Sequence, residues 1–424
     1  MPDRPVLATL LSIGDELVSG LTVDTNSASA ARQLRAAGVT ITGHRTVGDE
    51  QSHIESAVRE LATGHELLLI TGGIGPTPDD LTRQAVAAVA GQALVEDETW
   101  TERIRDIWTR RGRPMPESNR QQSTYPTGGS LLNNPIGTAG GVRVSLGECE
   151  VFVLPGVPRE FEAMMVEHVL PWTQSQVAER GGGVHRERAI HTFGRGESDI
   201  AEQLADLLKR NDDPNLSVGT TASNAVVSIR AYAAGKTEAN ANARLDQVEQ
   251  TVRHTLGELV FGTDDTTLPS AVMQLLKEQA RLVTFAESCT GGLCAKLLTD
   301  LPGSSDVFHR SVVTYANDAK AEMLGVPTEL LEKHGAVSEE VARAMAEGAL
   351  NNDPAASIAA SLTGIAGPGG GSELKPVGTV CFGLAMEGRP TQTHRLHLHG
   401  NRAMVRGRAA MTALNFIRLA LQSN

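Results

Sequence analysis

The 424-residue chain has 50 Asp and Glu against 38 Lys and Arg, a formal net charge of −12, and 3% aromatic residues. This acidic balance and the scarcity of rings argue against a surface built for duplex phosphates or for stacking single-stranded bases. The four cysteines have no CxxC spacing, which argues against a zinc knuckle or a disulfide framework and fits a reducing cytoplasm. The apolar run 6–13 is too short to span a bilayer, so we expect a cytoplasmic protein without membrane contact.

The first part of the chain, 1–176, alternates strand-like apolar runs with helical patterns. Strands are predicted at 6–14, 39–49, 65–73 and 149–158, and helices at 24–38, 52–64, 79–91 and 159–172. Such alternation predicts an α/β domain with a mostly parallel sheet covered by helices on both faces.

The stretch TGGIGPTPDD, residues 71–80, joins the third predicted strand to its helix. Ligands of open α/β sheets bind outside the carboxyl ends of the strands, so a site is expected in this loop. Its glycines expose backbone N–H groups that suit phosphate oxygens, whereas Asp79 and Asp80 would repel them unless a divalent cation bridges the two. More acids follow other predicted strands, and the alternative is that each of them merely caps a helix.

The glycine triplet 181–183 marks a boundary. The segment 177–263 has the shorter elements of a small α+β domain, and the polar linker GTDDTTLP separates it from 264–424. This last part again alternates strands and helices, so it is predicted to be a second α/β domain.

Several motifs of the first domain together resemble the molybdopterin-binding-fold domain of the CinA family. They are SIGDELVSGLTVDTNS, TGGIGPTPDDLT, NNPIGTAGG and FVLPGVPREFEAM. The resemblance implies metal-dependent hydrolysis of ADP-ribose to AMP and ribose 5-phosphate, with Mg, Mn or Co as the divalent ion and a monovalent cation as a further candidate. Such an ion polarises a pyrophosphate oxygen and generates hydroxide from bound water. The candidate metal ligands are Asp15, Glu16, Asp49, Asp79 and Asp80; the candidate nucleotide contacts are Asn26, Thr71, Gly72, Gly73 and Gly75.

The last domain is similar from end to end to the C-terminal CinA domain, the family of nicotinamide mononucleotide (NMN) deamidases. The matching motifs are AESCTGG, VVTYANDAK, SLTGIAGPGGG and GNRAMVR. The implied reaction hydrolyses the nicotinamide amide of NMN to nicotinic acid mononucleotide and ammonia, and needs no cofactor.

The motif AESCTGG predicts a turn between a strand and a helix, with Ser288 in the turn. Backbone N–H groups of Gly291 and Gly292 at the helix start are the predicted donors to an oxyanion. The neighbouring Cys289 is chemically the better nucleophile, so the pattern leaves both open, and the resemblance favours Ser288.

A base other than histidine is expected, because no His falls within a motif. Lys320 is predicted in the first turn of a helix, where the helix dipole should lower its pKa and let it act as general base. Tyr315 would relay or hold a proton; the alternative is that Tyr315 packs at the strand end and Lys320 is solvated. Ser305 is a further candidate hydroxyl near the amide.

The glycine loop after the strand that ends at SLTG is predicted to hold the mononucleotide through Thr363, Gly364 and Gly367. Arg402 and Arg406 stand at i and i+4 in a first helical turn, where a bound phosphate would offset their charge. The alternative for this pair is a solvated basic face.

The middle domain resembles the KH-type spacer of the CinA family but lacks a GxxG loop, so no direct nucleic-acid contact is expected. A homodimer is expected from the resemblance alone. The competing interpretation of the whole chain is a non-catalytic pterin- or nucleotide-binding accessory protein linked to competence or the DNA-damage response.

Overall fold

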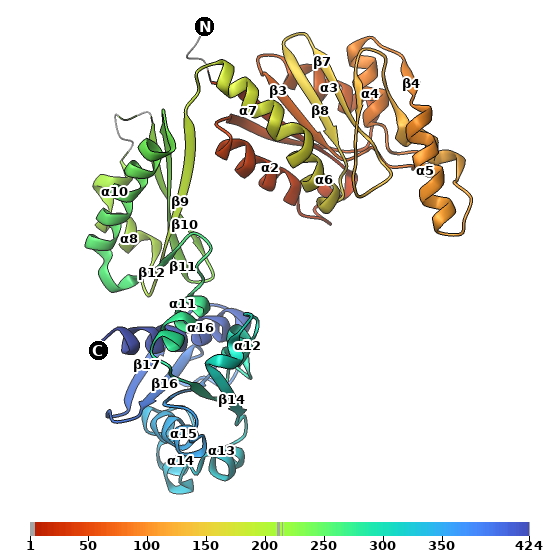
Figure 1. Ribbon diagram of the computed structural model, residues 1–424. Helices are drawn as coiled ribbons and strands as arrows, with labels where there is room; N and C mark the ends of the chain where they lie inside the picture. The colour runs from red at the N-terminus through yellow and green to blue at the C-terminus, as the bar shows by residue number, and fades with distance from the viewer. Residues whose placement is uncertain (1–4, 210–212, 214, 424) are drawn as a thin grey trace. The chain divides into compact units, whose positions relative to one another are not determined.

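The computed structural model describes residues 5–209, 213 and 215–423. The chain divides into two compact units, one formed by the residues up to Glu187 with Ala233–Arg244, the other by Arg188–Tyr232 with Leu245–Asn424. Each unit is described by itself (Figure 1).

The N-terminal sheet has the predicted α/β architecture. Its six strands lie in the order β2 (Thr40–Val47), β1 (Leu7–Ile13), β3 (Leu67–Thr71), β8 (Cys149–Leu154), β7 (Gly141–Leu146) and β6 (Ser130–Leu132). The first four strands are parallel, and β7 and β6 are antiparallel additions. The carboxyl ends of the parallel strands therefore share one edge, as the sequence predicts.

Helices cover both faces of this sheet (Figure 1). One face carries α2 (Thr25–Ala36), α6 (Pro158–Met164) and α7 (Leu170–Glu179), and the other carries α3 (Gln51–Ala62) and α4 (Thr82–Ala90). Because strand side chains alternate, β1 serves both cores: Leu10 enters the first and Leu11 the second.

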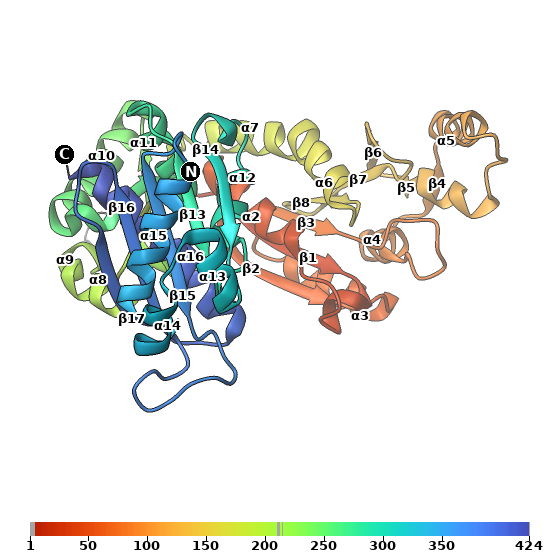
Figure 2. The ribbon, with the colours of Figure 1, turned by 90° about the horizontal axis from the view of Figure 1, so that it is seen from below.

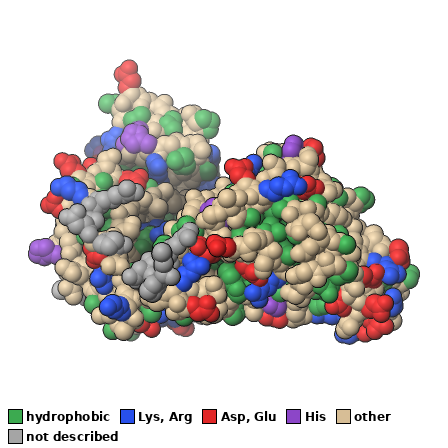
Figure 3. Space-filling model, turned by 90° about the horizontal axis from the view of Figure 1, so that it is seen from above, with side chains coloured by type: hydrophobic (Ala, Val, Ile, Leu, Met, Phe, Trp, Pro, Cys, Tyr) green, Lys and Arg blue, Asp and Glu red, His purple; other side chains and the backbone are tan. Residues whose placement is uncertain are grey.

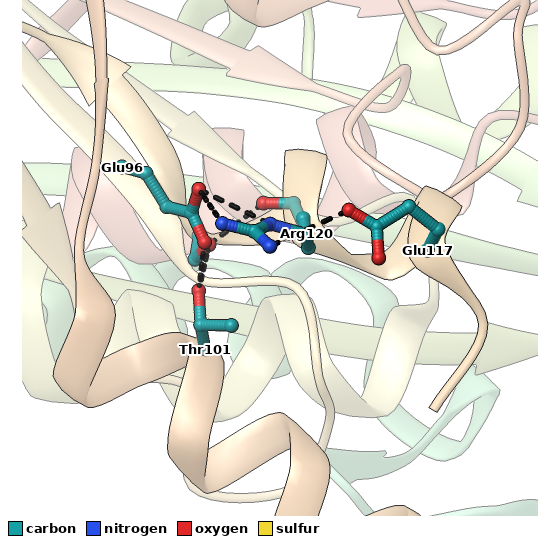
Figure 4. Close-up of polar contacts among 5 residues, drawn as sticks. Glu96, Thr101, Glu117 and Arg120 are labelled. Carbon is teal, nitrogen blue, oxygen red and sulfur yellow. Dashed lines mark hydrogen bonds and ion pairs between the residues drawn. The ribbon is translucent and has the colours of Figure 1, made fainter. Parts of the chain in front are cut away.

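A small lobe extends this domain beside α4. It consists of β4 (Leu94–Glu96), α5 (Glu98–Arg110), the 3-10 helix η1 (Glu117–Ser123) and β5 (Thr124–Pro126). A polar cluster fixes η1 within the lobe (Figure 4). Arg120 donates to Glu96 at 2.9 Å and lies 3.4 Å from Glu117, while the Thr101 hydroxyl donates to the second oxygen of Glu96 at 2.7 Å. Hydrogen bonds from Arg120 and then Thr101 lower the pKa of Glu96, so the carboxylate stays charged and the cluster stays closed.

The middle domain is the predicted small α+β domain. Its four-stranded sheet has the order β10 (Leu216–Ser223), β11 (Val226–Gly235), β9 (Val184–Phe193) and β12 (Val260–Thr263). Its helices are α8 (Glu197–Gln203), α9 (Ala205–Leu208) and α10 (Glu238–Leu256).

The C-terminal sheet has five strands. They lie in the order β14 (Phe308–Val313), β13 (Val283–Glu287), β15 (Ile358–Gly364), β16 (Thr379–Met386) and β17 (Gln392–His397). The first three are parallel and the last two antiparallel. This confirms the second α/β domain, and it gathers the ends of three parallel strands at one edge.

Helices again cover both faces (Figures 1 and 2). α11 (Leu268–Glu278), α12 (Leu293–Thr299) and α16 (Arg402–Gln422) contribute to one core, and α13 (Asn317–Leu324), α14 (Thr328–His334) and α15 (Glu339–Asn352) to the other. In the part of the chain that the structure describes, no helix has the length and apolar composition needed to cross a membrane.

Candidate functional site

The C-terminal site lies at the carboxyl edge of the parallel strands. Ser288 directly follows β13, and Lys320 lies on α13, which follows β14. Because β13 and β14 are parallel neighbours, the two side chains meet, with Lys320 Nζ 3.2 Å from Ser288 Oγ. Both are buried, at 1% exposure for Lys320 and 8% for Ser288. The structure thus brings together the two residues expected to carry nucleophile and base.

The Lys320 amine is held by main-chain oxygens. Nζ donates to the carbonyl of Thr314 at 2.8 Å and lies 3.4 Å from the carbonyls of Tyr315 and Ala316. Burial lowers the pKa of Lys320, and the nearby Cys289 and Asp318 oppose the shift only in part. The direction is the predicted one, but the leading cause is burial rather than the helix dipole. A lysine with a lowered pKa is neutral more often, and its lone pair can then accept the Ser288 proton.

The neighbouring Cys289 is a poor nucleophile in this setting. Its side chain is buried, and burial raises the pKa of the thiol to about 12. The thiolate is the reactive form, so a thiol that keeps its proton at neutral pH attacks slowly. The geometry therefore favours Ser288 over Cys289.

Glu287 has a structural role in this turn that the sequence analysis did not predict. Its side chain is fully buried, and the carboxylate lies at the start of α12. It accepts the N–H groups of Gly292 at 3.0 Å, Cys294 at 3.2 Å and Ala295 at 3.1 Å. The signal was present in the sequence: an acidic residue at the end of an apolar strand, just before a helix, is placed to satisfy the unpaired N–H groups of that helix.

These contacts correct the predicted oxyanion donors. The N–H of Gly292 is taken by Glu287, and the N–H of Gly291 donates to the carbonyl of Ser288 at 3.1 Å. Both groups are already used within the turn, so neither is free to receive a substrate oxygen. The prediction ignored the carboxylate that competes for the helix start.

The two arginines of α16 contact three segments of the site. Arg406 donates from Nε to the carbonyl of Cys289 at 3.1 Å and from Nη2 to that of Thr290 at 2.7 Å. Arg402 donates to the carbonyl of Gly367 and to the Tyr315 hydroxyl, each at 2.8 Å. Arg406 is half-buried by these contacts, so the alternative of a solvated face does not describe it, whereas Arg402 stays exposed. The phosphate-binding role stays a prediction for both.

The remaining predicted contacts have mixed positions. Tyr315 is 60% exposed and its hydroxyl meets Arg402, whereas only its carbonyl approaches Lys320. The Thr363 hydroxyl is buried and donates to the carbonyl of Ala336 at 2.8 Å, so it supports a loop. A Cβ on Gly364 would lie 2.9 Å from a carbonyl oxygen of β16, so this glycine permits close strand pairing.

Ser305 is not part of the site, and that expectation is corrected. It lies in η4 (Ser304–Asp306), just before the start of β14, whereas Ser288 follows the end of the parallel strand β13. The starts and ends of parallel strands lie at opposite sheet edges, roughly 17 Å apart for a strand of this length.

The N-terminal domain has a cleft of about 460 Å³ at the carboxyl edge of its parallel strands. Nine of the ten residues predicted to bind nucleotide or metal line it: Glu16, Asn26, Asp49, Thr71, Gly72, Gly73, Gly75, Asp79 and Asp80. Asn26 donates to the Thr71 hydroxyl and to the carbonyl of Gly156, each at 2.9 Å, and this ties α2 to the cleft floor. A Cβ on Gly72, whose φ is +102°, would lie 2.2 Å from the carbonyl oxygen of Ile13, so only glycine fits the floor there.

Gln121 holds the glycine loop from the side. Its amide donates to the carbonyls of Gly75 at 2.8 Å and Thr77 at 3.0 Å. It lies on η1, the helix that Arg120 and Glu96 fix (Figure 4). No local pattern in the sequence indicates this role, because the bonded residues are 46 and 44 positions apart, with α4 and α5 between them.

Several carboxylates at this edge of the sheet accept hydrogen bonds from backbone N–H groups. Asp15 and Asp49 exchange bonds: Asp49 accepts the Asp15 N–H at 2.9 Å, and Asp15 accepts the Asp49 N–H at 3.2 Å. Asp80 accepts the N–H of Thr77 at 2.8 Å. Only the bond from the Asp15 N–H to Asp49 lies at a helix start, that of α1; Asp15 and Asp80 themselves accept N–H groups of loop residues and cap no helix.

The charges nevertheless converge on Asp49. Burial raises the pKa of Asp49, and the neighbouring charges of Asp15, Glu16 and Asp79 raise it further, against the lowering effect of the Asp15 N–H. Carboxylates that repel one another at one cleft are an electrostatic setting that a cation relieves.

A closed metal cage is absent. Among residues 5–209, 213 and 215–423, no three His, Cys, Asp or Glu side chains are grouped to hold a metal ion. Mg²⁺-type ions, however, are usually held by one or two carboxylates, with phosphate oxygens and water completing the shell. The acids of the cleft fit this open mode, in which the ion would arrive with its phosphate ligand.

The sequence matches three family descriptions in chain order. Residues 9–175 match "Probable molybdopterin binding domain", 187–262 match "Damage-inducible protein CinA KH domain" and 265–421 match "CinA C-terminal domain". A competence-damage inducible protein of Symbiobacterium thermophilum is 42% identical over 97% of this chain and 98% of its own length. A CinA-like protein of Geobacter sulfurreducens is 41% identical over 97% and 98%. A crystal structure of the competence/damage inducible protein CihA from Agrobacterium tumefaciens is 43% identical, covering 37% of this chain and 94% of its own, with a TM-score of 0.35. The chain belongs to the CinA family.

Proposed function

We propose that the C-terminal domain hydrolyses the amide of NMN to nicotinic acid mononucleotide and ammonia, with Ser288 as nucleophile and Lys320 as base. One observation carries the proposal: the buried contact of 3.2 Å between Ser288 Oγ and Lys320 Nζ. Serine–lysine pairs of this kind activate a hydroxyl without histidine, because a desolvated lysine can take up its proton.

The reaction then has two halves. Ser288 Oγ attacks the amide carbon while its proton passes to Lys320 Nζ, and the C–N bond breaks as Lys320 returns that proton to the leaving ammonia. Lys320 then takes a proton from a water molecule, which attacks the acyl-serine; the C–Oγ bond breaks, Lys320 returns the proton to Ser288 Oγ, and the carboxylate leaves. Arg402 keeps Tyr315 and the glycine loop at Gly367 beside the pair.

The test is ammonia and nicotinic acid mononucleotide release from NMN by wild type, Ser288→Ala and Cys289→Ala. We expect loss of release in Ser288→Ala and retention in Cys289→Ala. Loss only in Cys289→Ala would move the nucleophile, and no release by wild type would refute NMN as the substrate.

A second candidate activity, hydrolysis of ADP-ribose to AMP and ribose 5-phosphate, belongs to the N-terminal cleft. It is supported by the glycine loop that lines the cleft and by the carboxylates around Asp49 at the same sheet edge. A divalent ion (Mg, Mn or Co, with a monovalent cation beside it as a further candidate) would polarise the pyrophosphate when bound. The residues that would hold it are Asp49 with Glu16 or Asp79, while the loop after Gly72 would contact the phosphates.

This activity is tested by AMP release from ADP-ribose with and without a chelator, beside NMN hydrolysis in the same samples. We expect the chelator to abolish AMP release and to leave ammonia release unchanged. AMP release that resists the chelator would contradict a metal-dependent cleft.

The proposed partners are small nucleotides, in a cytoplasmic protein that forms a homodimer. Direct nucleic-acid binding is not proposed, because the net charge is −12. On the face drawn in Figure 3, acidic side chains lie among the basic ones. A gel shift that persists at ~0.2 M salt would overturn this view.

A further inference from the structure

Two groups of opposite charge, the guanidinium of Arg406 and the carboxylate of Glu287, form hydrogen bonds with the turn Ser288–Gly292. The guanidinium of Arg406 takes the carbonyls of Cys289 and Thr290, while the carboxylate of Glu287 takes N–H groups at the start of α12. We propose that Arg406 is a positioning residue that aims the backbone N–H of Thr290, which together with the N–H of Cys289 provides the oxyanion donors of the Ser288 site. This inference rests on the proposed amide hydrolysis.

The direction of these N–H groups follows from the carbonyls that Arg406 holds. In a trans peptide the C=O and the next N–H point in opposite directions. Since the Cys289 carbonyl points at Arg406, the N–H of Thr290 points away from it. The Thr290 carbonyl likewise points at Arg406, and the following N–H, of Gly291, closes the turn on the Ser288 carbonyl.

Counting the N–H groups of the turn leaves two donors. Ser288 donates to the carbonyl of Leu362 at 3.0 Å, and the N–H groups of Gly291 and Gly292 are used as described above. Within the part of the chain that the structure describes, the N–H groups of Cys289 and Thr290 donate to no other residue. Both residues are buried, and buried N–H groups without an acceptor are rare.

Their position explains why they are unpaired. The oxyanion forms on the carbon that Ser288 attacks, and the N–H of the residue after a nucleophile is a recurrent donor to it. A buried donor kept open beside the nucleophile costs no reorganisation when negative charge appears on the substrate oxygen. The guanidinium of Arg406 that fixes this peptide is therefore used in hydrogen bonds to main-chain carbonyls.

The packing around Arg406 agrees with a fixed brace. A Cβ added to Gly291, whose φ is +61°, would lie 3.3 Å from Arg406 Nη2. The guanidinium therefore lies against the turn itself. Two carbonyls at the spacing of the planar fork suit arginine and not lysine, whose single ammonium cannot bond both in one plane.

The experiment compares Arg406→Met and Arg406→Lys with the control Arg408→Met in the full-length protein. Arg408 lies on the same helix and donates to the carbonyl of His399 instead. Two rates are measured: steady-state NMN hydrolysis, and covalent labelling of Ser288 by an alkyl fluorophosphonate, located by mass spectrometry. In the labelling, Ser288 Oγ bonds to phosphorus, fluoride leaves, and the hydroxyl proton passes to Lys320.

We expect both Arg406 variants to lose about 10²-fold in kcat, the effect of losing one oxyanion donor, with KM for NMN changed little. Fluorophosphonate labelling should slow in parallel, and added guanidinium should restore part of the rate to Arg406→Met. The Arg408→Met rates should match wild type.

A raised KM with unchanged kcat and unchanged labelling would overturn the proposal and make Arg406 a phosphate ligand. Unchanged kinetics in both variants would also overturn it. The labelling arm does not depend on NMN: if wild type is labelled but does not hydrolyse NMN, the proposed substrate fails while the role of Arg406 is still decided. If Arg406→Met does not fold, Arg406→Lys retains the charge and gives the same comparison.

Discussion

Replacing Glu287 by Gln should destabilise the C-terminal domain far more than the same change at an exposed helix start. The Glu287 carboxylate is fully buried and accepts three backbone N–H groups, which stabilise its charge. A glutamine has one acceptor oxygen in place of two, and its NH₂ group would face an N–H donor. Hydrogen bonds to a charged group contribute about 1.5–3 kcal/mol each, and an unpaired buried donor costs about 1–3 kcal/mol, so the expected loss is about 3 kcal/mol.

This loss predicts a lower unfolding temperature by about 6–12 °C for a domain of this size. The matched control is Glu339→Gln, an exposed glutamate in the first turn of α15, for which the dipole contributes only about 0.3–1 kcal/mol. Scanning calorimetry of the full-length proteins gives both shifts. A shift for Glu287→Gln no larger than that for Glu339→Gln would refute the reasoning.

Three further predictions concern titration and metal. The charge of Asp318 raises the pKa of Lys320, so Asp318→Asn should move the acid limb of the kcat/KM profile for NMN to lower pH. Because Asp318 is exposed, this shift should become smaller as salt is added. A shift to higher pH would contradict the prediction. The folded-state pKa of Lys320 lies below its ordinary value of 10.5, so the unfolded chain binds more protons between the two values. Denaturant titrations should therefore show wild type gaining stability relative to Lys320→Met as pH rises toward 10.5. Asp49→Asn should raise the Mn²⁺ concentration for half-maximal ADP-ribose hydrolysis by about 10–100-fold with NMN hydrolysis unchanged, and an unchanged Mn²⁺ requirement would remove Asp49 from the site.

The fold was predictable where the sequence pattern is strong. β1, β3 and β8 are rich in apolar residues, and helices such as α2 begin at a cap residue and end near glycine. The short strands β4, β5 and β6 have three residues each and carry no periodicity that distinguishes them from loop.

The candidate site was predictable to the extent that parallel strands decide it. Ser288 and Lys320 follow neighbouring parallel strands, so their meeting is a consequence of topology. Ser305 was misplaced because it precedes its strand, β14, and the starts of parallel strands lie at the edge opposite to the site. The acidic residue at the end of an apolar strand indicates that Glu287 bonds to the helix start, but which N–H groups it takes depends on side-chain geometry.

The way in which the C-terminal site is built also affects the order in which contacts form during folding. Its parts come from the ends of β13, β14 and β15 and from the first turns of α16, more than 100 residues after Ser288. Parallel pairing and such distant contacts close late, because the loop entropy must be overcome before any of them forms. The proposed site needs all three strand ends at once, so NMN hydrolysis should be the last property to return when the unfolded protein is refolded. The rate at which the proposed activity recovers would therefore report when the final helix, α16, docks.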